Sequence, residues 1–122
     1  MDKHFDQLVS DAIDNIPKQY QDKLQNVYFK IEDEPSDAQR KKLGLRKCDA
    51  LFGLYEGVPL TRRGGAVHSI VPDVITIFRI PMTQIFINEP ELKTQIFETV
   101  WHEVAHYFGL DHQRIHEVKN AV

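Results

Sequence analysis

Apolar residues recur at helical spacing near both ends of the 122-residue chain. Near the N-terminus they follow the pattern i, i+3, i+4, i+7, i+8 and i+11, which predicts a helix with one side in a core; these residues are Phe5, Leu8, Val9, Ala12, Ile13 and Ile16. A second stripe predicts a longer helix toward the C-terminus, and it consists of Leu92, Ile96, Val100 and Val104, flanked by Phe97 and Phe108. Pro17 ends the first helix, and residues 18–26 predict a short helical segment with Tyr20 and Leu24 turned inward.

Between these helices the pattern changes to one that is typical of strands. Residues 27–31 alternate as a strand does, and residues 74–80 form the strongest β pattern of the chain, with Pro81 at its end. The segment 51–65 is dense in glycine and proline, which favours an ordered loop or a bent strand over a long helix. Residues 82–88 fit two structures, because their apolar run favours a strand whereas Pro81 in a first turn would open a short helix.

Polar residues at two places are candidate helix caps. Ser36 would cap a short polar helix, and Asn88 would cap the long C-terminal helix. Glu91 stands three residues after Asn88 and can reach back to its backbone, which is the arrangement of a capping box. Thr94 is a second candidate for the cap of the same helix. The long helix is therefore predicted to begin between residues 88 and 95.

Composition and charge are those of an ordinary globular protein, with 42% hydrophobic and 27% charged residues. The length predicts one domain over residues 1–122. A net charge of −3 gives no reason to expect binding to nucleic acid or to an acidic membrane. Cys48 is the only cysteine, so we expect a reduced thiol and no disulfide framework. Because the sequence lacks a secretory pattern and a long apolar run, we expect a cytoplasmic protein without a membrane segment. We also expect a monomer.

The C-terminal helix carries the spacing H-E-x-x-H-x-x-G-x-x-H, from His102 to His112. On a helix His102 and His106 lie about 40° apart around the axis and one turn apart along it, so both rings can reach one metal ion. If the helix continued, His112 would lie about 280° round the axis and about 15 Å along it from His102, away from the other two rings. Gly109 offers the stop that lets the chain turn back, because glycine adopts the left-handed conformation without a steric penalty.

Three imidazoles leave a fourth position for water on zinc, which is typical of a catalytic and not of a structural site. Zinc lowers the pKa of a bound water to about 7, and Glu103 is placed to take its proton as general base for attack on a peptide carbonyl. Zn2+ is expected from the ligand type. His116 is a weaker alternative ligand. Tyr55, Arg62 and Arg63 could contact the substrate, and Glu98 could be a partner of His102. The ordinary interpretations are a core aromatic side chain for Tyr55, surface charge for the two arginines and a solvated residue for Glu98.

With these residues the chain resembles the small bacterial zincin-like metallopeptidases. The resemblance rests on three segments: the motif from His102 to His112, the run Gly53-Leu54-Tyr55-Glu56-Gly57-Val58-Pro59-Leu60-Thr61, and Pro72-Asp73 before the predicted strand. It implies an α+β minimal zincin fold, in which an N-terminal helix and the active-site helix pack against a small mixed sheet. It also implies zinc at His102, His106 and His112, with Glu103 catalytic. Metzincins share the motif, but they carry a methionine turn after the third histidine, whereas Met1 and Met82 both precede His112.

The sequence therefore predicts a zinc-dependent metallopeptidase that hydrolyses bonds in a peptide or protein substrate. Two alternatives use the same residues. One is a zinc-stabilised binding module that keeps the zincin fold without catalysis, and the other is a zinc hydrolase that acts on other amides. The presence of Glu103, which a purely structural zinc site would not need, favours the peptidase.

Overall fold

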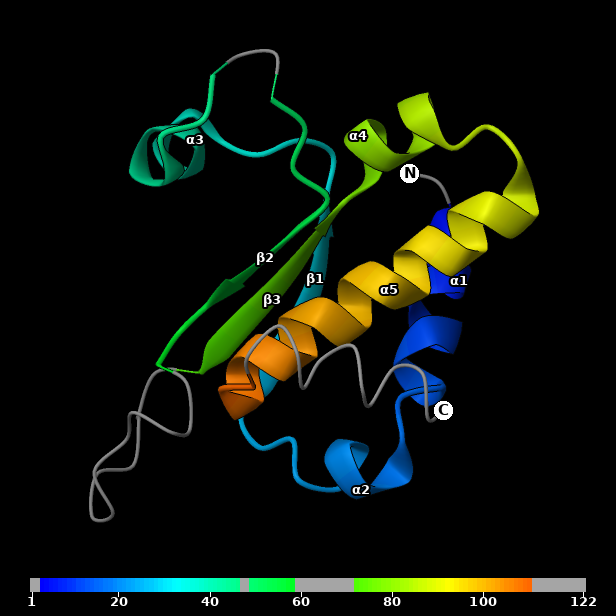
Figure 1. The fold of residues 1–122 in the computed structure, drawn as a ribbon, viewed down its shortest axis with the longest axis vertical. Helices are drawn as coiled ribbons and strands as arrows, with labels where there is room; N and C mark the ends of the chain where they lie inside the picture. Colours follow the sequence, from blue (N-terminus) through cyan, green and yellow to red (C-terminus); the bar gives the residue numbers. More distant parts are fainter. Residues whose placement is uncertain (1–2, 47–48, 59–71, 111–122) are drawn as a thin grey trace.

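A computed structural model describes residues 3–46, 49–58 and 72–110 of the chain, which form an α+β fold (Figure 1). The elements in chain order are α1 (Lys3–Asp14), α2 (Lys18–Gln21), β1 (Val27–Glu32), α3 (Asp37–Leu43), β2 (Gly53–Glu56), β3 (Asp73–Phe78), α4 (Arg79–Ile85) and α5 (Glu89–Phe108). Small size and the combination of a mixed sheet with a long C-terminal helix confirm the fold class that the sequence resemblance implied.

Within the described part of the chain, the sheet has three strands in the order β1-β3-β2. β1 runs parallel to β3, with the register Val27↔Asp73 to Glu32↔Phe78. β2 runs antiparallel to β3, with the register Gly53↔Ile77 to Glu56↔Val74. β2 is therefore an edge strand of the sheet that the described residues form, and one side of its backbone is not used by β3.

The core lies between the sheet and two helices. α5 packs on β2 and β3, and α1 packs against α5 (Figure 1). The apolar stripe of α1 and the inward side chains of β3 meet α5 in one cluster; its buried members are Phe5, Leu8, Val9, Ala12, Ile16, Ile75, Ile77, Met82, Ile96, Val100, Trp101, Val104 and Ala105. Tyr20 and Leu24 pack against this cluster, which confirms that they turn inward.

α5 is buried around more of its circumference than the predicted stripe suggested. Val100 and Val104 are fully buried as expected. Trp101 and Tyr107 are buried as well, with 1% of each residue exposed, and so is Glu103, with 7% exposed. The reason is that α5 has neighbours on two sides, because the sheet covers one side and α1 covers another. Glu103 is therefore buried, although it lies outside the apolar stripe that the sequence predicts.

The predicted helix caps can be compared with the N-terminal ends of α3 and α5. Ser36 and Gln39 form a complete capping box at α3, which confirms that Ser36 is an N-cap. Asn88 caps α5 by accepting a hydrogen bond from the Glu91 backbone N–H at 3.3 Å. Thr94 is wrong as a cap, because it lies inside α5 and its hydroxyl donates to the Pro90 carbonyl at 3.0 Å.

The end of the central strand differs from the prediction. β3 stops at Phe78, and α4 begins at the next residue, so the strand predicted over residues 74–80 is two residues too long. Pro81 lies in the first turn of α4, where its fixed φ suits a helix. This confirms the helical alternative for the following segment and makes the strand alternative for residues 82–88 wrong. The predicted helical segment 18–26 is likewise shorter, since α2 ends at Gln21.

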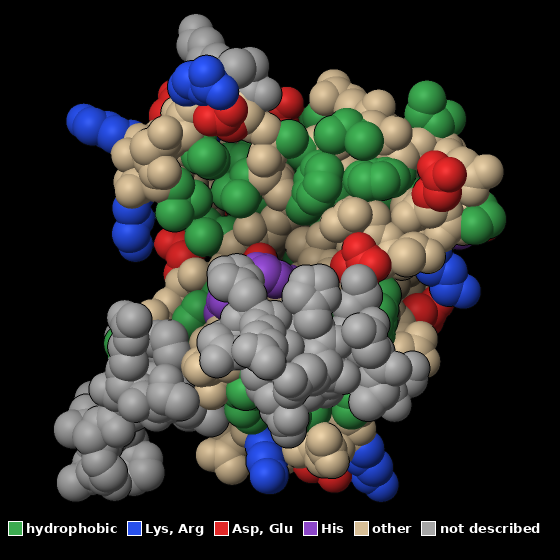
Figure 2. All heavy atoms as spheres, viewed as in Figure 1, with side chains coloured by type: hydrophobic (Ala, Val, Ile, Leu, Met, Phe, Trp, Pro, Cys, Tyr) green, Lys and Arg blue, Asp and Glu red, His purple; other side chains and the backbone are tan. Residues whose placement is uncertain are grey.

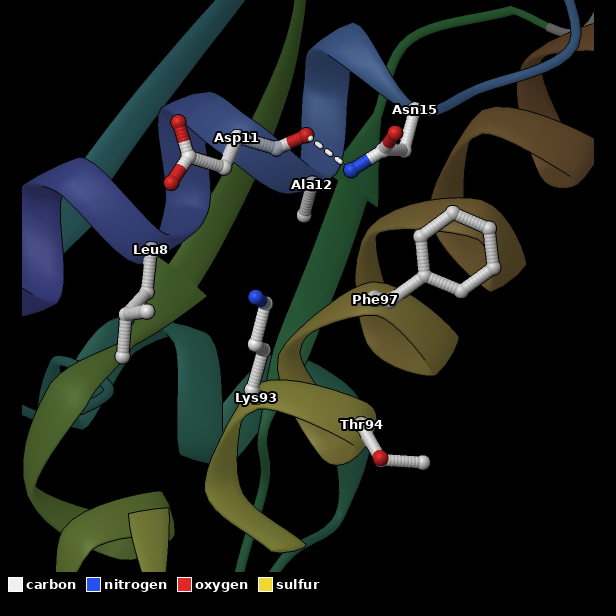
Figure 3. A pocket seen from close by; sticks show the side chains of 7 residues that line it. All are labelled: Leu8, Asp11, Ala12, Asn15, Lys93, Thr94 and Phe97. Carbon is white, nitrogen blue, oxygen red and sulfur yellow. Dashed lines mark hydrogen bonds between the residues drawn. The ribbon is translucent and has the colours of Figure 1, made fainter. Parts of the chain in front are cut away.

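α1 and α5 leave a pocket of about 420 Å³ between them, away from the motif histidines (Figure 3). Its floor is apolar, and Asp11, Asn15 and Lys93 stand at its polar border. The Asn15 side chain donates to the Asp11 carbonyl at 2.9 Å, which closes the last turn of α1.

Among the described helices, none is long and apolar enough to cross a membrane.

Gly53 allows β2 to lie directly on α5. A Cβ at this position would stand 2.6 Å from Thr99 Cγ2, 3.2 Å from Glu103 Cγ and 3.4 Å from the Thr76 carbonyl oxygen. The first distance is far below any contact that a real Cβ makes, and the β-branched Thr99 side chain has little freedom to move inside a helix. The two elements can therefore keep this spacing only with glycine at position 53.

We expect Gly53→Ala to lower the free energy of unfolding by about 1–3 kcal/mol, because the added methyl group overpacks the interface. Chemical denaturation measures this change. The matched control is Gly53→Ala combined with Thr99→Ser, which removes the methyl group that the new Cβ meets and keeps the hydroxyl. Gly53→Ala should cost less stability when it is added to Thr99→Ser than when it is added to the wild type. An equal loss of stability in both backgrounds would contradict the steric explanation.

Candidate metal centre

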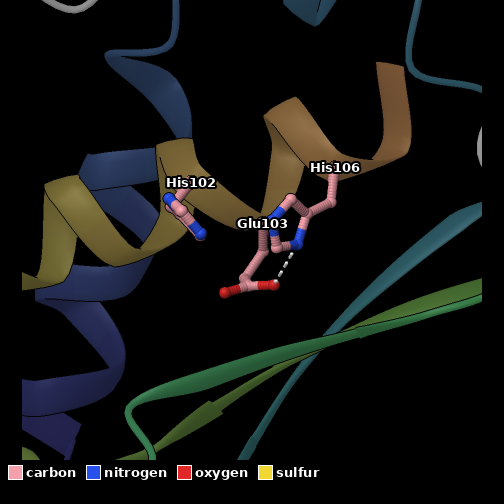
Figure 4. Close-up of side chains that lie close together, drawn as sticks. All are labelled: His102, Glu103 and His106. Carbon is pink, nitrogen blue, oxygen red and sulfur yellow. Dashed lines mark hydrogen bonds and ion pairs between the residues drawn. The ribbon is translucent and has the colours of Figure 1, made fainter. Parts of the chain in front are cut away.

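Three side chains of α5 come together on one side of the helix: His102, Glu103 and His106 (Figure 4). Each offers one ligand atom, and these atoms all lie within 4.8 Å of one another. The two imidazole rings are 4.5 Å apart between centroids and inclined by 68°. The i, i+4 spacing therefore brings the two rings to one point, as the sequence predicts.

Helix α5 ends directly after this group. Gly109 has φ 73° and ψ 26°, the left-handed conformation that the sequence predicts at this position. Its N–H donates to the His106 carbonyl at 3.0 Å, and the Leu110 N–H donates to the Ala105 carbonyl at 3.0 Å. This pair of bonds is the Schellman ending of a helix. The chain thus leaves the axis of α5 three residues after His106.

Glu103 points from α5 toward the strands and is the most buried member of the group (Figure 4). Its Oε1 lies 3.1 Å from Nδ1 of His106. A buried carboxylate without a partner is costly, by about 3–5 kcal/mol when a former partner is removed. The imidazole of His106 provides this partner within one turn of the same helix.

The contact with Glu103 also sets the chemistry of His106. The hydrogen bond to Glu103 raises the pKa of His106 above its ordinary value, and burial opposes this change. When Nδ1 donates its proton to the carboxylate, Nε2 keeps the lone pair that a metal ion needs. A carboxylate on the second ring nitrogen is the arrangement that orients metal-binding histidines and increases their basicity.

Tyr55 has a structural partner. Its hydroxyl donates to Oδ2 of Asp73 at 2.7 Å, and its ring packs edge-on against Tyr107 with centroids 6.3 Å apart. Asp73 is 3% exposed, so this hydrogen bond satisfies a buried carboxylate at the start of β3. The core interpretation of Tyr55 is therefore the one that its contacts favour.

Several predicted residues cannot be placed in this group. His112 lies outside the described residues, and so do His116, Arg62, Arg63 and Cys48. Glu98 lies on α5 one turn before His102 and is half-buried. The structure thus brings together two of the three predicted histidine ligands and the predicted catalytic glutamate.

The contribution of Gly53 and Thr99 to this group was not predicted from the sequence. Both lie directly beside Glu103, on β2 and on α5 respectively. A signal was present, since an isolated glycine between apolar residues such as Phe52 and Leu54 indicates a close approach of another element. The partner of that approach could not be identified, because it lies about fifty residues further along the chain.

The chemistry of the group fits a zinc ion. Imidazole nitrogens are preferred zinc ligands, and two of them lie on one helical side beside a carboxylate. A helix with this H-E-x-x-H group on a small mixed sheet defines a zincin-like protein. The family model for zincin-like metallopeptidases matches residues 24–121, and the chain belongs to this family. A comparison with curated proteins gave no match.

We expect Glu103→Gln to lower the pKa of His106, because the substitution removes the carboxylate that stabilises the imidazolium ion. NMR titration of the imidazole protons measures this pKa in protein treated with a chelator, so that no metal competes with protons. Glu34→Gln is the matched control, since Glu34 is an exposed carboxylate in the loop after β1. An unchanged His106 pKa in Glu103→Gln, or an equal decrease in the control, would contradict the contact.

Proposed function

We propose that the chain is a zinc-dependent metallopeptidase that hydrolyses peptide bonds. One observation carries this proposal: His102, Glu103 and His106 each bring a ligand atom to within 4.8 Å of the others on α5. Membership of the zincin-like metallopeptidase family supports the hydrolase class and the peptide or protein substrate. The family usually uses zinc, and the two imidazoles suit this ion better than they suit magnesium or calcium.

His102, His106 and His112 would hold the ion. The early end of α5 at Gly109 supports the inclusion of His112, because a continued helix would carry it away from the other two histidines. A bound zinc ion would supply a Lewis acid that polarises the substrate carbonyl and activates water. The role of the chain is to orient the two imidazoles, and the His106–Glu103 contact does this for one of them.

Glu103 would act as the general base. Its carboxylate has two oxygens, so the contact of Oε1 with His106 leaves Oε2 for a proton from the attacking water. The same carboxylate would then carry that proton to the leaving amine. Its position between α5 and β2 shields it from bulk solvent, which strengthens its electrostatic effect on nearby groups.

The edge strand β2 is the element that we expect to hold the substrate. It begins at Gly53, beside Glu103, and one side of its backbone is not used within the described sheet. An extended peptide can add to such an edge through main-chain hydrogen bonds, which requires no particular substrate sequence. A peptide bound there would pass close to Glu103, so substrate positioning and proton transfer would share one location.

We expect about one zinc ion per chain in protein purified without chelator, and much less in His106→Ala. Elemental mass spectrometry measures the metal content. His102→Ala should give the same loss and does not remove the partner of Glu103. His4→Ala is the matched control, because His4 is an exposed histidine on α1 that pairs with Glu89. Absence of zinc from the wild type after zinc is added back would exclude the metal site.

We expect Glu103→Gln to lower kcat/KM for peptide cleavage by about 10²–10⁴-fold, which is the usual contribution of a general base, while zinc stays bound. Mass spectrometry of a cleaved peptide library measures the loss. A metal-stabilised binding module would behave differently: zinc removal would lower Tm, and no peptide would be cleaved by the zinc-loaded wild type. A zinc-loaded wild type that cleaves no member of a broad library would therefore contradict the peptidase.

A further inference from the structure

A groove of about 400 Å³ lies between the end of α4 and the first half of α5. It is lined by Phe86, Pro90, Glu91, Thr94, Gln95 and Glu98. Figure 2 shows hydrophobic side chains gathered on this face of the molecule, with histidine and acidic side chains at their lower border. The groove ends at Glu98, one helical turn before His102, so it adjoins the candidate metal centre.

The floor of the groove is aromatic. Phe86 packs edge-on against Phe52, with ring centroids 5.8 Å apart, and this contact fixes the position of the Phe86 ring. The two neutral polar side chains of the groove have partners within α5: the Thr94 hydroxyl donates to the Pro90 carbonyl, and the Gln95 amide donates to the Thr99 hydroxyl, both at 3.0 Å. The other lining side chains that a ligand would contact are the Phe86 and Pro90 rings and the carboxylates of Glu91 and Glu98.

An aromatic floor with two carboxylates suits an arginine side chain. The guanidinium group can stack on the Phe86 ring, and its fork of N–H donors can pair with Glu91 or Glu98. Its aliphatic stem can cover the apolar surface while the charged end stays at the border. A purely apolar side chain would remove water from the carboxylates without donating a hydrogen bond to them, and an acidic side chain would be repelled. Lysine offers the charge but not the planar surface.

The groove and the metal centre are connected along one side of α5. Glu98, His102 and His106 follow one another at i, i+4 and i+8 on α5, and all three are half-buried. Eight residues of helix span about 12 Å, and an extended peptide covers about 3.3 Å per residue. A side chain in the groove would therefore belong to a residue about two to four positions from the bond at the metal centre.

We propose that this groove binds an arginine side chain of the peptide substrate, about two to four residues from the cleaved bond and on one side of it only. The inference rests on the proposed function for the position of the cleaved bond. It assigns a specificity role to Phe86, Glu91 and Glu98, none of which is a proposed metal ligand or the proposed general base.

The test uses short alanine-rich peptides that carry a hydroxamate group, which anchors one end of the peptide on zinc. A single arginine is placed one to five residues from the hydroxamate, in one series with the hydroxamate at the C-terminal end and in a second with it at the N-terminal end. Fluorescence polarisation measures Kd for the zinc-loaded protein. We expect about five- to tenfold tighter binding for arginine at one or two neighbouring positions of one series, with lysine weaker and glutamate worse than alanine.

Variants of the groove locate the effect. Glu91→Lys should remove the preference for arginine, and Phe86→Leu, which keeps an apolar side chain, should reduce it. Glu89→Lys is the matched control, because Glu89 lies two residues away but pairs with His4 of α1. The control should keep the preference. Added salt should weaken the binding of the arginine peptide more than the binding of the alanine peptide, since salt screens an exposed ion pair.

The outcomes separate this inference from the proposed function. Equal affinity at every arginine position, or the same loss in Glu89→Lys as in Glu91→Lys, would overturn the arginine site. A protein that prefers the arginine hydroxamate but cleaves no peptide would support the groove and contradict the peptidase. Peptide cleavage without any arginine preference would support the peptidase and overturn the groove.

Discussion

The candidate metal centre depends on how closely α5 lies against β2. At the level of Thr99 and Glu103 the strand has no side chain, because position 53 is glycine, and a Cβ there would collide with Thr99. Further along, the rings of Tyr55 and Tyr107 meet edge-on and keep the strand and the helix aligned. A misplacement of about 1 Å at a reacting group can cost a hundredfold in rate. The position of Glu103 is thus set by the contact of the whole helix with the strand.

This close contact creates an electrostatic problem that the helix itself solves. Glu103 is buried between α5 and the sheet, and a buried carboxylate needs a partner. His106 lies three residues further on, so the imidazole reaches the carboxylate without any contribution from another element. The contact that stabilises the buried charge also selects which ring nitrogen of His106 carries the proton. Burial of the base and orientation of the ligand therefore have a common cause.

The local features of the fold could be predicted from the sequence, and the contacts between distant elements could not. The spacing of His102 and His106 fixes their common side, and Ser36, Asn88 and Gly109 act as caps because capping depends on a few neighbouring residues. The burial of Glu103 depends instead on Gly53, which the sequence places far away. The end of β3 at Phe78 was also missed, because Arg79 and Ile80 fit the pattern of a strand as well as that of a helix, and the first turn of α4 decides between them.

A three-stranded sheet offers little surface for substrate recognition, so the proposed function requires each element to contribute more than one contact. β2 borders the base through Gly53 and can offer its backbone edge to a peptide. Backbone pairing alone would accept almost any extended sequence, since every residue supplies the same groups. Selectivity must then come from side-chain pockets, and the groove ends at Glu98, one helical turn before His102 on α5. Because both of its carboxylates stand on the same helix as the base, one rigid element can link recognition to chemistry.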